Sequence, residues 1–198
     1  LRLAAEGACV VVADRDLDAA TAVAAEIGGP DKAIAVKVDV TDEAAIIATV
    51  HASSLAFGGV DLVVNNAGLS LSKSLTETTV ADWDLQHDVM ARGSFLMSRE
   101  SAKAMIAQGR GGRLIAAASV SSHRGGKWQS AYAASKFAVR GMSQSAAQEL
   151  AEYGITVNVY SPGVIDTKMW EAIDSEITHR KDQKKGQAFE DVLDLVAM

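Results

Sequence analysis

Two residues in the segment SAYAASKFAVRG (130–141) could act together as an acid–base pair. Tyr132 and Lys136 are four positions apart, which is about one helical turn, so both side chains would leave one face with Cβ atoms about 6 Å apart. A nearby ammonium favours the ionised form of a phenol and would lower its pKa. Such pairs also arise by chance on half-exposed helices, so the other residues must decide between the two interpretations.

The elements that must position this pair alternate along the chain. Short apolar runs lie at 8–14, 33–40, 60–68, 113–119 and 155–163. Helical patterns lie at 16–28, 42–57, 81–109 and 129–153, with further possible helices at 168–180 and 187–197. Apolar strands separated by long helices indicate parallel βαβ units in a sheet covered on both faces. We predict an α/β fold, a doubly wound parallel sheet of Rossmann type, in one domain over 1–198.

Local signals mark where these helices begin and end. Gly28, Gly109 and Gly154 lie near the C-termini of three helices and are typical stop signals. Thr41 or Asp42 is the expected N-cap of the helix at 42–57.

Unusual residues gather where the predicted strands end. They are Asp14, Asp39, the NNAG of 65–68, Ser119 and Pro162-Gly163. In an open parallel sheet, ligands bind along this edge because strand ends and helix N-termini converge there. The sequence therefore predicts a single site at the carboxyl edge of the sheet.

Several of these residues have a functional and a purely structural interpretation. A carboxylate such as Asp14 at a strand end binds ribose hydroxyls in dinucleotide folds and would repel a 2′-phosphate, which favours NAD over NADP. Asp14 could equally cap the helix that starts near 16. Asp39 could bind adenine or belong to a helix-start turn, and NNAG could admit a ligand close to the backbone or form a turn.

Composition and charge exclude several other classes of function. The 198 residues are 48% hydrophobic with a net charge of −6 and no basic block, which argues against a nucleic-acid partner. No apolar stretch is long enough to span a membrane. The four histidines are far apart without ligands at metal spacing, so we predict no metal. Cys9, the single cysteine, is expected to be buried, in a protein of the reducing cytoplasm.

Taken together, these motifs resemble the short-chain dehydrogenase/reductase family. The matching residues, in order over almost the whole chain, are Asp14, Asp39-Val40, Asn65-Asn66-Ala67-Gly68, Ser119, Tyr132, Lys136, Asn158, Pro162-Gly163 and Thr167. Ser119 precedes Tyr132 by 13 residues, which is the spacing familiar in this family.

The resemblance implies hydride transfer between NAD(H) and a secondary alcohol or ketone. Tyr132 would be the general base or acid, Ser119 would bind the substrate oxygen, and Lys136 would bind the nicotinamide ribose and lower the tyrosine pKa. The implied cofactor contacts are Asp14, Asp39, Val40, Asn65, Ala67, Gly68, Tyr132, Lys136, Pro162, Gly163 and Thr167. It also implies a homo-oligomer, dimer or tetramer, formed through the helices at 81–109 and 129–153.

The sequence departs from the family pattern in two places. Met90 stands where the family usually has the Asn of its proton relay, which implies impaired catalysis, although Met90 could simply fill a gap in the core. The family also begins with a strand and a Gly-rich loop before the ribose-binding acid. LRLAAEGA reads instead as the tail of a first helix, and the last strand is not reached, so we expect a fragment truncated at both ends.

We expect an NAD-dependent oxidoreductase of the EC 1.1.1 type acting on a small polyol, diol or sugar-like substrate. Candidate substrate contacts, besides Ser119, are His123, Trp128, Met169 and Trp170, and both tryptophans could instead be packing residues. Two alternatives remain open. One is an NADPH-dependent 3-oxoacyl-type reductase, and the other is a non-catalytic relative that acts as a binding or scaffold protein.

Overall fold

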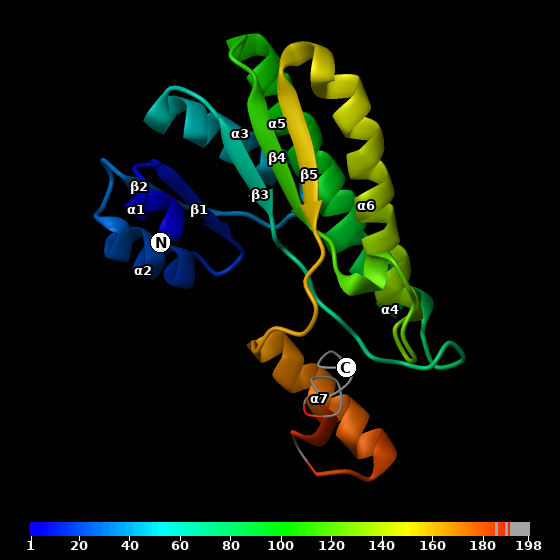
Figure 1. Cartoon of the computed structure of the whole chain (residues 1–198). Coiled ribbons are helices and arrows are strands. Elements are labelled where there is room, and N and C mark those ends of the chain that lie inside the picture. Colours follow the sequence, from blue (N-terminus) through cyan, green and yellow to red (C-terminus); the bar gives the residue numbers. More distant parts are fainter. Residues whose placement is uncertain (185, 189, 191–198) are drawn as a thin grey trace.

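The computed structural model describes residues 1–184, 186–188 and 190, and it has the parallel α/β arrangement that the sequence predicts (Figure 1). The strands are β1 (Val10–Asp14), β2 (Ala33–Lys37), β3 (Leu62–Asn65), β4 (Gly112–Ala117) and β5 (Ile155–Tyr160). Each matches one of the five predicted runs and is shorter than the run; four lie within it, and β4 begins one residue earlier, at Gly112. Cys9 precedes β1 and is exposed, so its expected burial is wrong.

The helices also follow the predicted pattern, with one difference. They are α1 (Arg2–Ala5), α2 (Leu17–Ile27), α3 (Glu43–Phe57), α4 (Val80–Gln86), α5 (Gly93–Gln108), α6 (Ser130–Leu150) and α7 (Lys168–Lys181). The single helix expected at 81–109 is divided by a π-helical turn at His87–Arg92. The helix expected at 187–197 lies mostly outside the described residues.

The helix termini form where local sequence places them. Asp42, rather than Thr41, is the N-cap of α3, because its carboxylate accepts hydrogen bonds from the amides of Ala44 (2.9 Å) and Ala45 (3.3 Å). Asp16 caps α2, because its side chain accepts a hydrogen bond from the Ala19 amide. The capping role considered for Asp14 therefore belongs to Asp16. Gly109 ends α5 with φ of 68°, a left-handed conformation that glycine adopts without steric cost.

The strands form two parallel sheets rather than one continuous sheet. β1 pairs with β2, and β4 lies between β3 and β5. In the strand order of a doubly wound sheet, the place between β1 and β3 belongs to a strand that precedes β1. The element described before β1 is the helix α1, so β1 and β3 each have one edge unpaired among the described residues.

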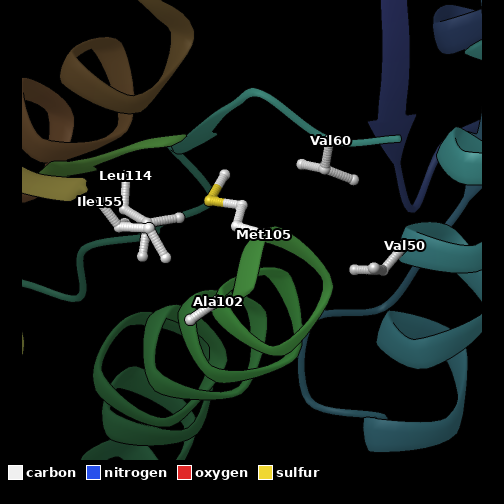
Figure 2. Packing of buried hydrophobic residues seen from close by; sticks show 6 residues of the cluster. All are labelled: Val50, Val60, Ala102, Met105, Leu114 and Ile155. Carbon is white, nitrogen blue, oxygen red and sulfur yellow. The ribbon is translucent and has the colours of Figure 1, made fainter. Parts of the chain in front are cut away.

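The main core lies between the three-stranded sheet and the helices α3 and α5. Met105 of α5 is fully buried and packs with Val50, Ala102, Leu114 and Ile155, and Val60 completes the cluster (Figure 2). Because these residues come from α3, α5, β4 and β5, their packing fixes how the strands lie over the helices.

A second, smaller cluster joins the two sheets. Val38, just after β2, packs with Ile46 of α3 and Leu96 of α5. The backbone at Gly93 also approaches this region closely, since a Cβ atom there would lie 2.9 Å from Cγ2 of Val40. A side chain at position 93 would therefore separate the start of α5 from the segment that follows β2.

We predict that Met105→Ala lowers the free energy of unfolding by about 2–5 kcal/mol, because it leaves a cavity in the centre of the main core. Ile106→Ala is the matched control, since Ile106 is the next residue of α5 and is 38% exposed, and should cost less than half as much. Urea denaturation followed by circular dichroism measures both. Equal losses in the two variants would contradict this description of the core.

Candidate active site

Ser119 lies just past the end of β4, and its side chain is held in place by the turn that follows. Its Oγ accepts a hydrogen bond from the amide of Ser121 (3.1 Å), and its carbonyl accepts one from the Ser122 hydroxyl (2.7 Å). Only 7% of Ser119 is exposed. The Ser119 hydroxyl therefore has a fixed position at the carboxyl edge of the sheet.

Tyr132 and Lys136 lie one turn apart on α6 and face this same edge. The Lys136 ammonium lies 5.8 Å from the centre of the Tyr132 ring, and Nζ donates a hydrogen bond to the Ala117 carbonyl (2.6 Å) at the end of β4. The neighbours Ala131, Ala133 and Ser135 are small and buried. This explains the run of small residues, because they allow α6 to pack closely while both long side chains reach the sheet edge.

Burial dominates the electrostatics of the pair. Burial lowers the pKa of Lys136 to about 8. Burial raises the pKa of Tyr132, and a hydrogen bond with the Ser119 side chain acts in the opposite direction. The lowered tyrosine pKa that the sequence led us to expect is therefore not a property of the chain alone, because the desolvation of the phenol outweighs the favourable bond.

The acidic residues at the ends of β1 and β2 both have exposed carboxylates. Asp14 accepts a hydrogen bond from the amide of Asp16 (2.9 Å). Asp39 accepts bonds from the amide (2.9 Å) and hydroxyl (2.7 Å) of Thr41, which lower its pKa. Val40 follows, half-buried against Gly93. Both carboxylates are accessible at the same edge of the sheet.

The NNAG segment links β3 to its surroundings through both asparagines. Asn65 donates to the Ser98 hydroxyl of α5 (2.9 Å). Asn66 accepts a hydrogen bond from the Tyr160 hydroxyl at the end of β5 (2.6 Å). Ala67 is exposed, and Gly68 lies over Met90, whose sulfur would be 3.6 Å from an added Cβ. The backbone of 66–67 is thus open to a ligand while the side chain of Asn65 supports the fold.

The segment after β5 completes the edge. The Pro162 carbonyl accepts a hydrogen bond from the Val120 amide (3.0 Å), which holds this segment beside the turn after Ser119. Gly163 and Thr167 are exposed, and Thr167 precedes α7. Pro162 therefore lies close to Ser119, whereas Thr167 marks the start of the helix beyond it.

The candidate substrate residues lie on two separate segments, one between β4 and α6 and the other at the start of α7. His123 lies 3.2 Å from the Ser161 hydroxyl through Nε2. Trp128 is half-buried with φ of 63°, an unusual backbone conformation for a bulky residue, and the Lys127 ammonium lies 4.5 Å from its ring centre. Met169 is exposed and Trp170 is half-buried, both on the first turn of α7.

Met90 is buried beside α6. It is 1% exposed, it sits within the π-helical turn, and its sulfur accepts a weak hydrogen bond from the Ser135 hydroxyl (3.8 Å). It therefore fills the space between Gly68 and α6, which agrees with the packing interpretation. A thioether in this position offers no amide group to a proton relay.

Two contributors to the site carry no signal in the sequence. Ala117 acts through its backbone carbonyl, which any residue supplies, so only the structure identifies it. Gln129 accepts a hydrogen bond from the Ser121 hydroxyl (3.2 Å) and its backbone pairs with Lys73 as a parallel bridge. Its position three residues before Tyr132 would have been the only available hint.

The residues present fit the ribose ends of a dinucleotide. The Lys136 ammonium has three N–H donors, and the residue is only 5% exposed. Among the described residues, the Ala117 carbonyl is the one acceptor that it contacts. Sugar hydroxyls could accept the remaining donors. Asp14 and Asp39 offer exposed carboxylates to the hydroxyls and amino group of an adenosine.

The described residues contain neither a metal-binding cluster nor a membrane-spanning helix. No cluster of three or more His, Cys, Asp or Glu side chains is arranged to hold a metal ion there. None of the helices in that part of the chain is long and apolar enough to cross a membrane.

Comparison with known proteins gives consistent matches. The sequence profile of the family described as short chain dehydrogenase matches residues 1–178. Galactitol 2-dehydrogenase of Agrobacterium fabrum is 40% identical over 184 residues, covering 93% of this chain and 71% of that protein. L-2,3-butanediol dehydrogenase of Corynebacterium glutamicum is 36% identical over 200 residues, covering 100% of this chain and 78% of that protein.

A solved structure matches the fold closely. The crystal structure of sorbitol-6-phosphate 2-dehydrogenase from Erwinia amylovora superposes with a TM-score of 0.92 at 35% identity. The match covers 98% of this chain and 77% of that one. The likeness therefore extends over both sheets and the helices between them.

We predict that the buried charge of Lys136 makes stability depend on pH. The unfolded lysine titrates near 10.4, so between pH 8 and 10.4 the unfolded chain binds more protons and stability rises with pH. Lys136→Met removes the cost of burying the charge, on the order of 3 kcal/mol for this shift. Its advantage over the wild type in urea denaturation should therefore be largest at pH 7 and shrink by pH 10.

Lys103→Met serves as the control, because the Lys103 side chain is 64% exposed and should leave the pH slope unchanged. Tyr132 is present in both the wild type and Lys136→Met, so its own titration largely cancels when the two stability curves are subtracted. A pH-independent difference between wild type and Lys136→Met would show that the ammonium is not desolvated.

Proposed function

The chain belongs to the short-chain dehydrogenase family, and we propose that it transfers a hydride between NAD(H) and a small secondary alcohol or ketone. The observation that carries the proposal is the grouping of Ser119, Tyr132 and Lys136 at one edge of the sheet, two of them fixed to the end of β4. The similarity to a galactitol 2-dehydrogenase and an L-2,3-butanediol dehydrogenase supports a polyol or diol as substrate.

In alcohol oxidation the chain's own residues handle the proton. The Ser119 hydroxyl, held by Ser121, hydrogen-bonds the substrate oxygen and places it against Tyr132 Oη. Tyr132, as the phenolate, accepts the hydroxyl proton while the carbinol C–H bond breaks and the carbonyl forms. The bound nicotinamide supplies the acceptor for the hydride. In ketone reduction the same phenol returns its proton to the substrate oxygen.

Lys136 acts in this scheme by position and charge. The Ala117 carbonyl orients its ammonium, and the two remaining N–H donors would be available to the hydroxyls of a bound ribose. Burial raises the pKa of Tyr132 in the chain alone, so positive charge close to the phenol is needed to favour the phenolate. Lys136 supplies one such charge, provided that it stays protonated.

The preference for NAD rests on Asp14. Its exposed carboxylate at the end of β1 would accept hydrogen bonds from ribose hydroxyls and repel a 2′-phosphate. An NADPH-dependent 3-oxoacyl-type reductase would need a cation at this place that no carboxylate opposes. The exposed Arg15 instead follows Asp14 directly, and its charge also acts on Asp39. We therefore favour the NAD-dependent activity.

We also propose that the protein works as a homo-oligomer in the cytoplasm. Phe95, Ile106 and Phe137 on α5 and α6 are large apolar residues that remain 38–44% exposed. Apolar side chains gathered on neighbouring helices support a surface that pairs with another copy. The exposed thiol of Cys9 suits a reducing compartment.

We predict that Tyr132→Phe lowers kcat at least 100-fold, because the variant has no proton to exchange with the substrate oxygen. NADH should still bind, as titrated by quenching of tryptophan fluorescence, since the ring and Lys136 remain. Tyr153→Phe is the control, because this exposed tyrosine lies at the far end of α6. Retained turnover in Tyr132→Phe would overturn the assignment, and a chain that never binds NADH would point to the non-catalytic alternative.

We predict that Asp14→Ser reduces the preference for NADH over NADPH roughly 10-fold or more, because a charged hydrogen bond to the ribose is lost along with the repulsion of the 2′-phosphate. The ratio of the two dissociation constants measures the effect. Asp18→Ser removes the same charge from the exposed face of α2 and should leave the ratio unchanged. An equal effect of both substitutions would reduce the role of Asp14 to general electrostatics.

A further inference from the structure

The Tyr160 hydroxyl connects two strand ends that are not neighbours in the sheet. Tyr160 is the last residue of β5, and its hydroxyl donates a hydrogen bond to the side-chain oxygen of Asn66 (2.6 Å), just after β3. β4 lies between these strands (Figure 1), so two strand spacings, or about 10 Å, separate their backbones. Ala117, in register with Tyr160 on β4, has only a methyl side chain and leaves room for the ring. The tyrosine therefore bridges the sheet at its carboxyl edge.

The segment that receives this bond has little other support. β3 ends before it, and within the part of the chain that the structure describes no backbone hydrogen bond involves residues 66–70. The next polar contact along the chain is at Leu71, whose amide donates to the buried Gln86 side chain (3.1 Å). Over residues 66–70, the Tyr160 hydroxyl is thus the one hydrogen-bond partner that the described residues provide.

The open backbone of this segment lies where the proposed function places the cofactor. Ala67 is exposed and Gly68 has no side chain, so a ligand can approach their amide and carbonyl groups closely. Asp14 and Asp39 also lie at strand ends, along the edge where ligands of parallel α/β sheets bind. A ligand that binds a moving segment must first order it, which weakens binding. A bond that fixes residues 66–67 beforehand therefore strengthens cofactor binding.

The backbone of Tyr160 is itself fixed relative to Ser119. The Tyr160 carbonyl accepts a hydrogen bond from the Ala118 amide (2.9 Å), and two residues later the Pro162 carbonyl accepts one from the Val120 amide (3.0 Å). Ala118 and Val120 are the residues on either side of Ser119. The tyrosine side chain therefore starts from a defined position beside the candidate catalytic serine and ends on the segment after β3.

The Tyr160 hydroxyl remains a hydrogen-bond donor at neutral pH. A tyrosine in water titrates near 10, and burial raises the pKa of Tyr160 further. Its partner, the Asn66 amide, is not a titratable group. The contact therefore persists around pH 8, where burial places the pKa of Lys136, and its effect on binding can be separated from that of the lysine charge.

We propose that Tyr160 is a positioning residue for the cofactor, which holds the backbone of residues 66–67 in the conformation that binds the dinucleotide. Tyr160 is not among the site residues that the sequence predicts. The inference rests on the proposed function, because it takes the dinucleotide to lie along this edge of the sheet. Tyr160 has no part in the proton transfer, so its loss should change how tightly the dinucleotide binds and not how fast the hydride moves.

Quenching of tryptophan fluorescence by NADH tests this role in the full chain, in Tyr160→Phe, in Asn66→Ala and in the double variant. Loss of one hydrogen bond should raise the NADH dissociation constant about fivefold in either single variant. The double variant should also show about fivefold rather than about 25-fold, because both substitutions remove the same bond. With an alcohol that the wild type oxidises, the KM for NAD should rise in Tyr160→Phe while kcat at saturating NAD stays unchanged.

Tyr153→Phe is the matched control, since it removes the hydroxyl of another exposed tyrosine, in the turn after α6, and should leave the NADH constant unchanged. Three results would overturn the positioning role. They are an unchanged constant in Tyr160→Phe, shifts that multiply in the double variant, and a fall in kcat without a shift in the constant. Lower stability in urea with an unshifted constant would reduce the contact to a purely structural one.

Failure of the proposed function is recognised separately from failure of this inference. If the wild type binds no NADH and no alcohol yields NADH, the proposed function is wrong and the role of Tyr160 falls with it. If the wild type binds NADH and Tyr160→Phe binds it equally well, the positioning role alone is contradicted.

Discussion

The hydrogen bond from the Lys136 ammonium to the Ala117 carbonyl connects α6 to the sheet, and the candidate site depends on it. It joins residues 19 positions apart at a distance of 2.6 Å. Ser119 lies two residues beyond Ala117, so the same strand end orients both the serine hydroxyl and the ammonium. Tyr132, one turn before Lys136 on α6, is thereby placed opposite Ser119.

The hydrogen bond between Lys136 and Ala117 requires that the ammonium be buried. Removing a charge from water is unfavourable on its own. Burial lowers the pKa of Lys136 to about 8, yet the ammonium remains mostly protonated near pH 7. Small residues make the arrangement sterically possible, since Ala131, Ala133 and Ser135 let α6 approach β4 and β5. The protein thus accepts a local cost in stability at the place where the proposed hydride transfer needs a fixed positive charge, as is common at active sites.

Much of this architecture could be predicted from the sequence because the signals are local. The apolar runs predict all five strands, and Asp42 and Gly109 mark helix ends through their own backbone and side-chain chemistry. Features that depend on distant partners could not be predicted. The Ala117 carbonyl has no side-chain signature, the π-helical turn around Met90 arises from packing against α6, and the bond from Tyr160 to Asn66 joins residues 94 positions apart.

The division of the strands into two sheets has a consequence for how the molecule fluctuates. No backbone ladder crosses from β1 to β3 among the described residues, so the halves are coupled through α3 and the small cluster of Val38, Ile46 and Leu96. Regions with little shared apolar contact open with their own, lower free energies. In the part of the chain that the structure describes, we therefore expect the unit of β1, β2 and α2, which carries Asp14, to exchange its amide hydrogens in local openings that leave the half with Ser119 and Tyr132 folded.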